Sequence, residues 1–216
     1  MLTKFADVVL LTIVPLFFAI ALHEISHGLA AFALGDNTAQ KAGRFKLHTH
    51  FDLVGSLLLP GILYLLHFPF VIGYAKPVPV NARNFKDPLV DMAIVAIAGP
   101  LCNLLLALAM ALLLNNINIT AAPLCEFCAH FVIANLCLFF LNLIPIPPLD
   151  GSRVAAALMP EKFVGTYYAL EPFGFFIIIA IEMFLRQLST LVGSNISLFH
   201  FAIDVPMRGI LNMLFA

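Results

Sequence analysis

The chain of 216 residues is 62% hydrophobic and 11% charged, with a mean hydropathy of +1.03 and a formal net charge of -1. This apolar share is well above that of a soluble globular domain and is typical of a membrane protein. The near-zero net charge and the lack of a basic tail argue against nucleic-acid binding. The length predicts one domain over residues 1–216, and the long apolar runs predict an all-α polytopic membrane fold.

The first predicted helix covers about Phe5–Leu34 and contains an H-E-x-x-H pattern formed by His23, Glu24 and His27. Residues four apart lie on one face of a helix, so both imidazoles can bind the same metal ion. Glu24 lies one position further round, where it can reach a water molecule at that ion. Two histidines that only pack or face solvent are the ordinary alternative, but polar clusters inside an apolar helix are usually functional.

A polar loop over residues 36–52 follows, in which His48, His50 and Asp52 alternate. They are candidates for a second metal site, although solvated loop residues are the more common explanation. The next apolar segment, Leu53–Leu66, is shorter than the roughly 20 residues that a spanning helix needs. We therefore expect a re-entrant or interfacial segment there.

β-Branched and aromatic residues predict a short β-hairpin over Phe70–Asn81, near the predicted active site. Two prolines of this segment lack an N–H group, so the edge to which they point cannot form a complete hydrogen-bond ladder. An ordinary Pro-rich loop is the alternative. In the hairpin interpretation the opposite edge stays free, and it is offered by Lys76, Val78 and Val80.

Two longer apolar segments, Pro88–Leu114 and Leu124–Ile144, are predicted to span the membrane. A Gly-Pro pair in the first allows close helix approach or a kink, and Asn103 follows on the same face as the glycine. The second ends in a run that contains Asn142 and three prolines. Prolines end regular helix, so Asp150 is expected on a turn that can point inward.

Apolar residues continue through Val164–Val192 and Ile196–Phe215, which predicts C-terminal helices over about residues 164–216. The last of them can span or lie at the membrane interface. Glu182 and Arg186 are four apart, so we expect an ordinary helical ion pair between them. The chain as a whole is then predicted to contain about five to six apolar helices.

The distribution of basic residues predicts how the protein is oriented in the membrane. If Leu53–Leu66 does not cross the membrane, the H-E-x-x-H end of the first helix and the Asp150 loop open on the same side. The opposite side then carries Lys4 as its one basic residue, and the positive-inside rule puts the site toward the cytoplasm. The basic residues expected on the cytoplasmic side are Lys41, Arg44, Lys46, Lys76, Arg83, Lys86, Arg153 and Lys162.

Three motifs together resemble the site-2 protease family of intramembrane zinc metalloproteases, in a compact form without a PDZ or CBS domain. They are H-E-x-x-H, G-P-x-x-N ending at Asn103, and N-x-x-P-x-x-x-L-D-G beginning at Asn142. The resemblance covers about residues 5–158, the expected catalytic core. It implies one Zn²⁺ per chain with the ligands His23, His27 and Asp150, the general base Glu24, and a substrate groove lined by Asn142, Asn103, Lys76, Val78 and Val80.

The activity implied is hydrolysis of peptide bonds in or near the transmembrane segments of membrane proteins. The expected partners are a transmembrane protein or peptide substrate and the lipid bilayer, in a bacterial-type inner membrane. The alternative is a polytopic membrane protein that binds or transports a metal without proteolysis. A transporter needs polar residues along a continuous path, whereas the polar motifs here are expected at one depth. The sequence does not indicate an oligomeric state.

Overall fold

The structure, a computed structural model, describes residues 9–66, 73–117, 121–194 and 196–215. Throughout these residues the regular elements are helical, and they include no strand. Four helices are long and apolar enough to cross a membrane, which confirms the all-α prediction and indicates a membrane protein. Their ranges are Val9–Ala33, Pro88–Asn116, Ala122–Asn142 and Glu171–Val192.

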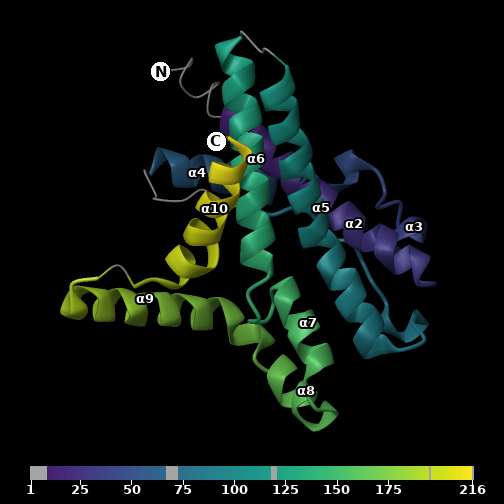
Figure 1. Cartoon of the computed structure of the whole chain (residues 1–216). Helices are drawn as coiled ribbons and strands as arrows, with labels where there is room; N and C mark the ends of the chain where they lie inside the picture. The colour runs from purple at the N-terminus through teal and green to yellow at the C-terminus, as the bar shows by residue number, and fades with distance from the viewer. Residues whose placement is uncertain (1–8, 67–72, 118–120, 195, 216) are drawn as a thin grey trace.

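The elements follow the chain as shorter 3₁₀ or π-helical turns (η) and α-helices (Figure 1). Before the longest helix they are η1 (Val9–Ile13), α2 (Val14–Ala33), α3 (Thr38–Lys41), η2 (Leu47–His50), η3 (Val54–Leu58), α4 (Leu59–Leu65) and η4 (Ala82–Asn84). From the longest helix onward they are α5 (Pro88–Asn116), α6 (Ala122–Asn142), α7 (Asp150–Leu158), α8 (Glu161–Tyr168), η5 (Glu171–Phe173), α9 (Gly174–Val192), η6 (His200–Asp204) and α10 (Val205–Leu214).

Helices α2, α5 and α6 form the centre of the molecule and pack against one another (Figure 1). Small side chains at helical spacing let apolar helices approach closely in a membrane. Helix α2 buries such a face, with a residue every fourth position at Ala19, His23, His27 and Ala31. The buried face of α5 contains Ala96, Gly99, Asn103, Ala107 and Ala111. The predicted metal-binding histidines therefore belong to a helix-packing face.

A second group of buried side chains joins α5, α6 and the last helix. Ala107 and Ala111 of α5 contact Val132 and Leu136 of α6, and all four are almost fully buried. Side chains of α10, among them Met207, cover this cluster. The segment predicted over Ile196–Phe215 is thus a short helix that packs along the bundle.

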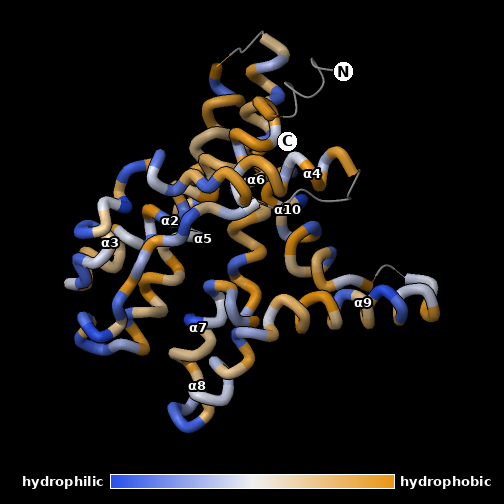
Figure 2. Tube along the Cα trace, turned by 180° about the vertical axis from the view of Figure 1, so that it is seen from behind, coloured by the Kyte–Doolittle hydropathy of each residue, from blue (hydrophilic) through white to orange (hydrophobic). Residues whose placement is uncertain are grey.

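Polar residues gather toward one end of the bundle (Figure 2). The hydrophilic residues lie in α3, at the beginning of α5 and in part of α8, whereas α6 and α10 are mainly hydrophobic. Many large apolar side chains of the long helices are exposed, for example Leu105 (58%) and Leu112 (56%) of α5. Exposed apolar surface of this extent suits a lipid environment rather than water.

The prediction of a re-entrant segment over Leu53–Leu66 is not supported. These residues form the five-residue η3 and the seven-residue α4, one continuous short helix that lies across the direction of α5 and α6 (Figures 1 and 2). At 1.5 Å per residue the helix is about 18 Å long, too short to cross a bilayer core of about 30 Å. Composition alone did not distinguish a loop that enters and leaves the membrane from a helix lying across the bundle.

The predicted β-hairpin is also not found. Phe70–Ile72 lie outside the described residues, and Gly73–Asn81 is extended but forms no strand. Backbone groups of this segment bond to residues of the helical turns η2 and η3 instead of to another strand. Tyr74 N–H donates to Gly55 O (3.0 Å), and Lys76 N–H donates to His50 O (2.9 Å). The hairpin prediction is therefore wrong, because these N–H groups bond to residues of other elements and not to a neighbouring strand.

Helix α9 has the length and composition of a spanning helix, yet it runs across the direction of α5 and α6 (Figures 1 and 2). Glu182 on α9 is buried and accepts hydrogen bonds from Ser197 Oγ (2.9 Å) and Leu198 N–H (2.8 Å), which precede the last helix. The predicted pair with Arg186 is present, at 2.5 Å. These contacts hold the middle of α9 against the segment that precedes η6 and the last helix.

Candidate metal centre

The helix register of α2 brings two imidazoles to the same buried position. His23 and His27 lie four residues apart, and both are at most 9% exposed. Their Nε2 atoms are 2.9 Å from each other. The predicted pairing of the two histidines on one helix face is therefore what the structure shows.

Asp150 reaches this pair from far along the chain. Its Oδ2 atom lies 3.0 Å from His23 Nε2 and 3.3 Å from His27 Nε2. Ligand atoms bound to zinc at about 2.0–2.2 Å in a tetrahedron lie roughly 3.3–3.6 Å apart. The three atoms are therefore spaced as three ligands of one ion, and across the described residues no other His, Cys, Asp or Glu group of three or more meets the geometry of a metal site.

The hydrogen bonds around the cluster show why a cation fits there. His27 Nδ1 donates to Val95 O (2.8 Å), and His23 Nδ1 bonds to Asn103 Oδ1 (2.6 Å). With both Nδ1 atoms protonated, both Nε2 atoms present lone pairs. Asp150 Oδ2 is also buried and has no hydrogen-bond donor among the described residues. Three mutually facing lone-pair atoms repel one another unless a cation lies between them, so the residues fit a metal ion.

Asp150 is the first residue of α7, following the Pro-rich turn after α6. Arg153 on the same helix bonds to both carboxylate oxygens of Glu171 (3.1 and 3.2 Å) and lies over the Tyr168 ring, which ties α7 to the next segment. Asp150 would hold a cation through its ionised carboxylate, the form in which carboxylates bind metals.

Gly99 allows α5 to approach the two histidines. A Cβ atom at this position would lie 2.5 Å from His27 Cε1 and Nε2 and 2.6 Å from His23 Cε1. Real Cβ contacts are essentially never this short, so any other residue here would displace the imidazoles. The G-P-x-x-N motif therefore contributes a steric requirement of the metal centre.

Glu24 is half-buried beside the cluster and contacts the extended segment. Its Oε2 atom accepts a hydrogen bond from Val78 N–H (2.9 Å). Together with the Lys76 N–H bond to His50 O, this contact uses the edge that was predicted to be free. The correction has a simple cause: the N–H groups of an extended segment bond to nearby carbonyl and carboxylate groups when no strand is present.

The other residues predicted to bind substrate have different surroundings. Asn103 is fully buried, so its side chain faces His23 rather than an open groove. Asn142, the last residue of α6, donates to Leu138 O (3.1 Å) and stays a predicted substrate contact. The side chain of Val80 packs beside the buried Val95 cluster.

The candidate second metal site in the polar loop is not assembled. His48 is exposed, and Asp52 Oδ1 instead accepts from Val54 N–H and Gly55 N–H at 3.0 and 2.8 Å. His50 is fully buried, with Nδ1 2.9 Å from Lys76 O and Nε2 2.8 Å from Arg44 O. His50 therefore joins the loop to the extended segment instead of facing solvent.

Asp36 anchors the chain that leads from the extended segment into α5. It is fully buried and accepts hydrogen bonds from Asn81 N–H (2.7 Å), Asn84 Nδ2 (2.6 Å) and Thr38 N–H (3.1 Å). Burial alone would raise the pKa of Asp36, but the hydrogen bonds from Thr38, Asn81 and Asn84 outweigh it and lower that pKa. Sequence reasoning did not single out this residue.

Because the folded-state pKa of Asp36 is lowered, the ionised carboxylate stabilises the fold at neutral pH, and this stabilisation is lost as the pH falls below about 4. We expect Asp36→Asn to lower the free energy of unfolding by about 1–3 kcal/mol at pH 7. Thermal unfolding in detergent at pH 7 and at acidic pH measures the difference between the two proteins. A difference that does not shrink at acidic pH would contradict the assignment.

Comparison with known proteins identifies relatives over most of the chain. A Bacillus subtilis protein named "Putative zinc metalloprotease YwhC" is 34% identical over 190 residues, which cover 83% of this chain and 82% of the relative. "Putative zinc metalloprotease Rip2" of Mycobacterium tuberculosis is 30% identical, over 78% of this chain and 63% of the relative. Rip2 of Mycolicibacterium smegmatis is 30% identical, over 82% of this chain and 68% of the relative. No family model matches the chain, and no solved structure matches it.

Proposed function

The chain belongs to the site-2 protease family, whose members here are named as zinc metalloproteases, and from this premise we propose that it is an intramembrane zinc metalloprotease. It hydrolyses peptide bonds in or near transmembrane segments of membrane proteins. The observation that carries the proposal is the cluster of three possible ligand atoms of His23, His27 and Asp150, 2.9–3.3 Å apart, inside an apolar helix bundle.

In the proposed reaction His23, His27 and Asp150 hold one zinc ion per chain. Zinc bound there supplies Lewis acidity for water activation and carbonyl polarisation. Glu24 accepts a proton from the attacking water and delivers it to the leaving nitrogen. Its carboxylate accepts a hydrogen bond from Val78 N–H, which orients it. Asn142 is proposed to donate a hydrogen bond to the developing oxyanion.

A transmembrane substrate must expose a peptide bond that its helix hides by internal hydrogen bonding. We propose that the substrate unwinds locally and lies as a strand along Val78 and Val80, because both backbone groups of Lys76 already bond to His50. Since Val78 N–H bonds to Glu24, binding of a strand would exchange this contact for one with the substrate. The exchange would release the Glu24 carboxylate for proton transfer at the moment when the substrate arrives.

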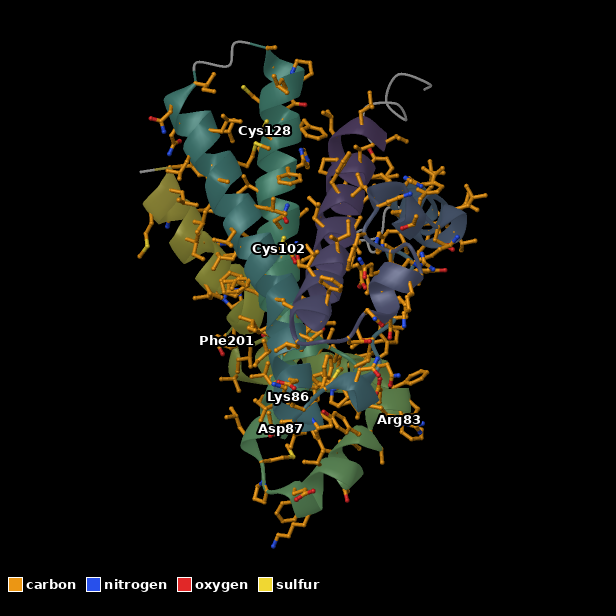
Figure 3. All side chains as sticks on the ribbon, turned by 90° about the vertical axis from the view of Figure 1, so that its right-hand side faces the viewer. Arg83, Lys86, Asp87, Cys102, Cys128 and Phe201 are labelled. Carbon is orange, nitrogen blue, oxygen red and sulfur yellow. The ribbon has the colours of Figure 1, made fainter. Side chains whose placement is uncertain are left out.

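The site is proposed to open toward the cytoplasm of a bacterial-type cell membrane. Arg83 and Lys86 lie at the end of the bundle where α5 begins, and Cys128 lies toward the opposite end (Figure 3). Hydrophilic segments gather at the same end as these basic residues (Figure 2). An excess of Lys and Arg on one side is the usual mark of the cytoplasmic face.

Zinc removal tests the proposal. The purified protein in detergent is given two membrane-spanning peptides, one with a Gly-Pro pair in the helix and one with an uninterrupted poly-Leu helix. We expect about one zinc per chain, loss of cleavage on chelation, and recovery when zinc is added back. The Gly-Pro peptide should be cut roughly 10-fold faster or more, because proline destabilises the helix that must unwind.

The outcomes separate the candidate functions. Zinc binding without cleavage of either peptide would favour a membrane metal-binding or transport protein. Equal rates for the two peptides would overturn the strand-capture step but leave the protease intact. A soluble peptide with the same cleavage sequence is assayed as a third substrate, and its cleavage as fast as that of both spanning peptides would show that membrane substrates are not preferred.

A further inference from the structure

A chain of hydrogen bonds runs from α6 through α5 to the metal centre. Asn135 Nδ2 donates to Phe131 O (2.8 Å), and Asn135 Oδ1 accepts from Asn103 Nδ2 (2.8 Å). Asn103 Nδ2 also donates to Ala19 O (3.0 Å), and Asn103 Oδ1 lies 2.6 Å from His23 Nδ1. Both asparagines are fully buried, so no water competes for these groups.

The donor and acceptor of every hydrogen bond in this network follow from two backbone carbonyl groups, Phe131 O and Ala19 O, which can only accept. Phe131 O requires the NH₂ group of Asn135 on its side, which leaves Asn135 Oδ1 facing α5. The NH₂ group of Asn103 must then face Asn135 Oδ1 and Ala19 O, which leaves Asn103 Oδ1 facing His23. An oxygen at 2.6 Å requires a proton on His23 Nδ1, so His23 Nε2 is left bare for a metal.

We propose that Asn135 is a positioning residue of the metal centre, acting through Asn103 to hold His23 in the tautomer whose Nε2 binds the ion. The inference rests on the proposed metalloprotease function. Neutral imidazole can carry its proton on either nitrogen, and the second hydrogen bond of a ligating histidine selects the form that binds. Inside a membrane the selection is strong, because an unpaired N–H or carbonyl group there has no water to bond.

Zinc affinity measures this role without catalysis. Competition with a chromophoric chelator, in detergent, gives the Kd of the wild type, Asn103→Leu, Asn135→Leu and the double variant. Loss of such outer contacts typically weakens metal binding 10–100-fold. We expect roughly 100-fold for Asn103→Leu and roughly 10-fold for Asn135→Leu, since Ala19 O still orients Asn103. The double variant should bind no more weakly than Asn103→Leu alone, because Asn135 acts through Asn103.

Leu136→Ala is the matched control, since Leu136 is the fully buried neighbour of Asn135 on α6 and packs in the apolar cluster with Ala107, Ala111 and Val132. It should lower the melting temperature and leave the zinc Kd unchanged. The visible spectrum of the Co²⁺-loaded protein should change for Asn135→Leu and not for Leu136→Ala. Asn135→Ala repeats the test with a smaller side chain in case leucine prevents folding.

Two results would overturn the proposal: folded Asn135 variants that bind zinc within twofold of the wild type, or a double variant whose loss equals the product of the single losses. Either result would leave Asn135 as a packing residue while the wild type still binds zinc and cleaves. A wild-type protein that binds no zinc would instead overturn the proposed function itself.

Discussion

Replacing Glu24 with Gln is expected to lower the rate of peptide cleavage by roughly 10²–10⁴-fold while one zinc ion stays bound per chain. General acid-base catalysis by a positioned side chain contributes a factor of this size, and a neutral amide cannot take a proton from water. The three proposed ligands are unchanged. The amide oxygen of the substituted side chain can still accept the hydrogen bond from Val78 N–H that Glu24 Oε2 accepts at 2.9 Å. The substitution therefore removes the base with little change in shape.

Zinc content and initial cleavage rates of the purified variant measure this prediction. Glu126→Gln makes the same chemical change on α6, away from the metal centre, and should leave both quantities at the wild-type level. A Glu24→Gln protein that cleaves within threefold of the wild-type rate would remove Glu24 as the general base. Such a result would indicate that another group accepts the proton of the attacking water.

Gly99→Ala is expected to weaken zinc binding by roughly 100-fold or more, with a matching loss of cleavage. The added methyl group would lie 2.5–2.6 Å from atoms of both histidine rings. Two packed helices cannot absorb such an overlap without separating, because interiors are close-packed. Separation of α2 from α5 would also lengthen the bond between His23 and Asn103. The effect should therefore exceed the 10–100-fold typical of one lost outer contact.

Gly209→Ala provides the control, because a Cβ atom at this α10 position meets nothing within 4 Å. That variant should bind zinc and cleave as the wild type does. Kd measurements with a competing chelator and melting temperatures distinguish displaced ligands from a general loss of stability. Unchanged zinc affinity in Gly99→Ala would show that α5 can move without disturbing the histidines.

Local sequence rules predicted the part of the site that lies on one helix. His23 and His27 face the same way because four residues make about one turn, and this geometry needs no tertiary contact. The positions of α5 and α6 also agree with the predicted spans, since the length and hydropathy of an apolar run can be read directly from the sequence. Asp150 was selected as the third ligand by its place after a span and by the resemblance to a family.

The predictions that failed concern segments whose structure depends on hydrogen-bond or packing partners far away in the sequence. The segment Gly73–Asn81 has the composition of a strand, but its N–H groups bond to His50, Gly55 and Glu24 instead of to another strand. The resemblance to the protease family implied that Asn103 lines a substrate groove. The packing of α5 on α2 buries it against His23. Asn135, a polar residue in an apolar helix, carried the same kind of signal and was overlooked.

What the sequence by itself determined is the long apolar helices α5 and α6 and the pairing of His23 with His27, because both follow from the pattern of residues along the chain. Only the tertiary structure decided that Asp150 meets them, that Val78 N–H binds Glu24, and that α9 lies across the bundle. These features depend on contacts between residues far apart in sequence, such as Glu182 with Ser197. A periodic pattern specifies which face of a helix is apolar, but the close packing of complementary faces specifies which neighbour that face meets.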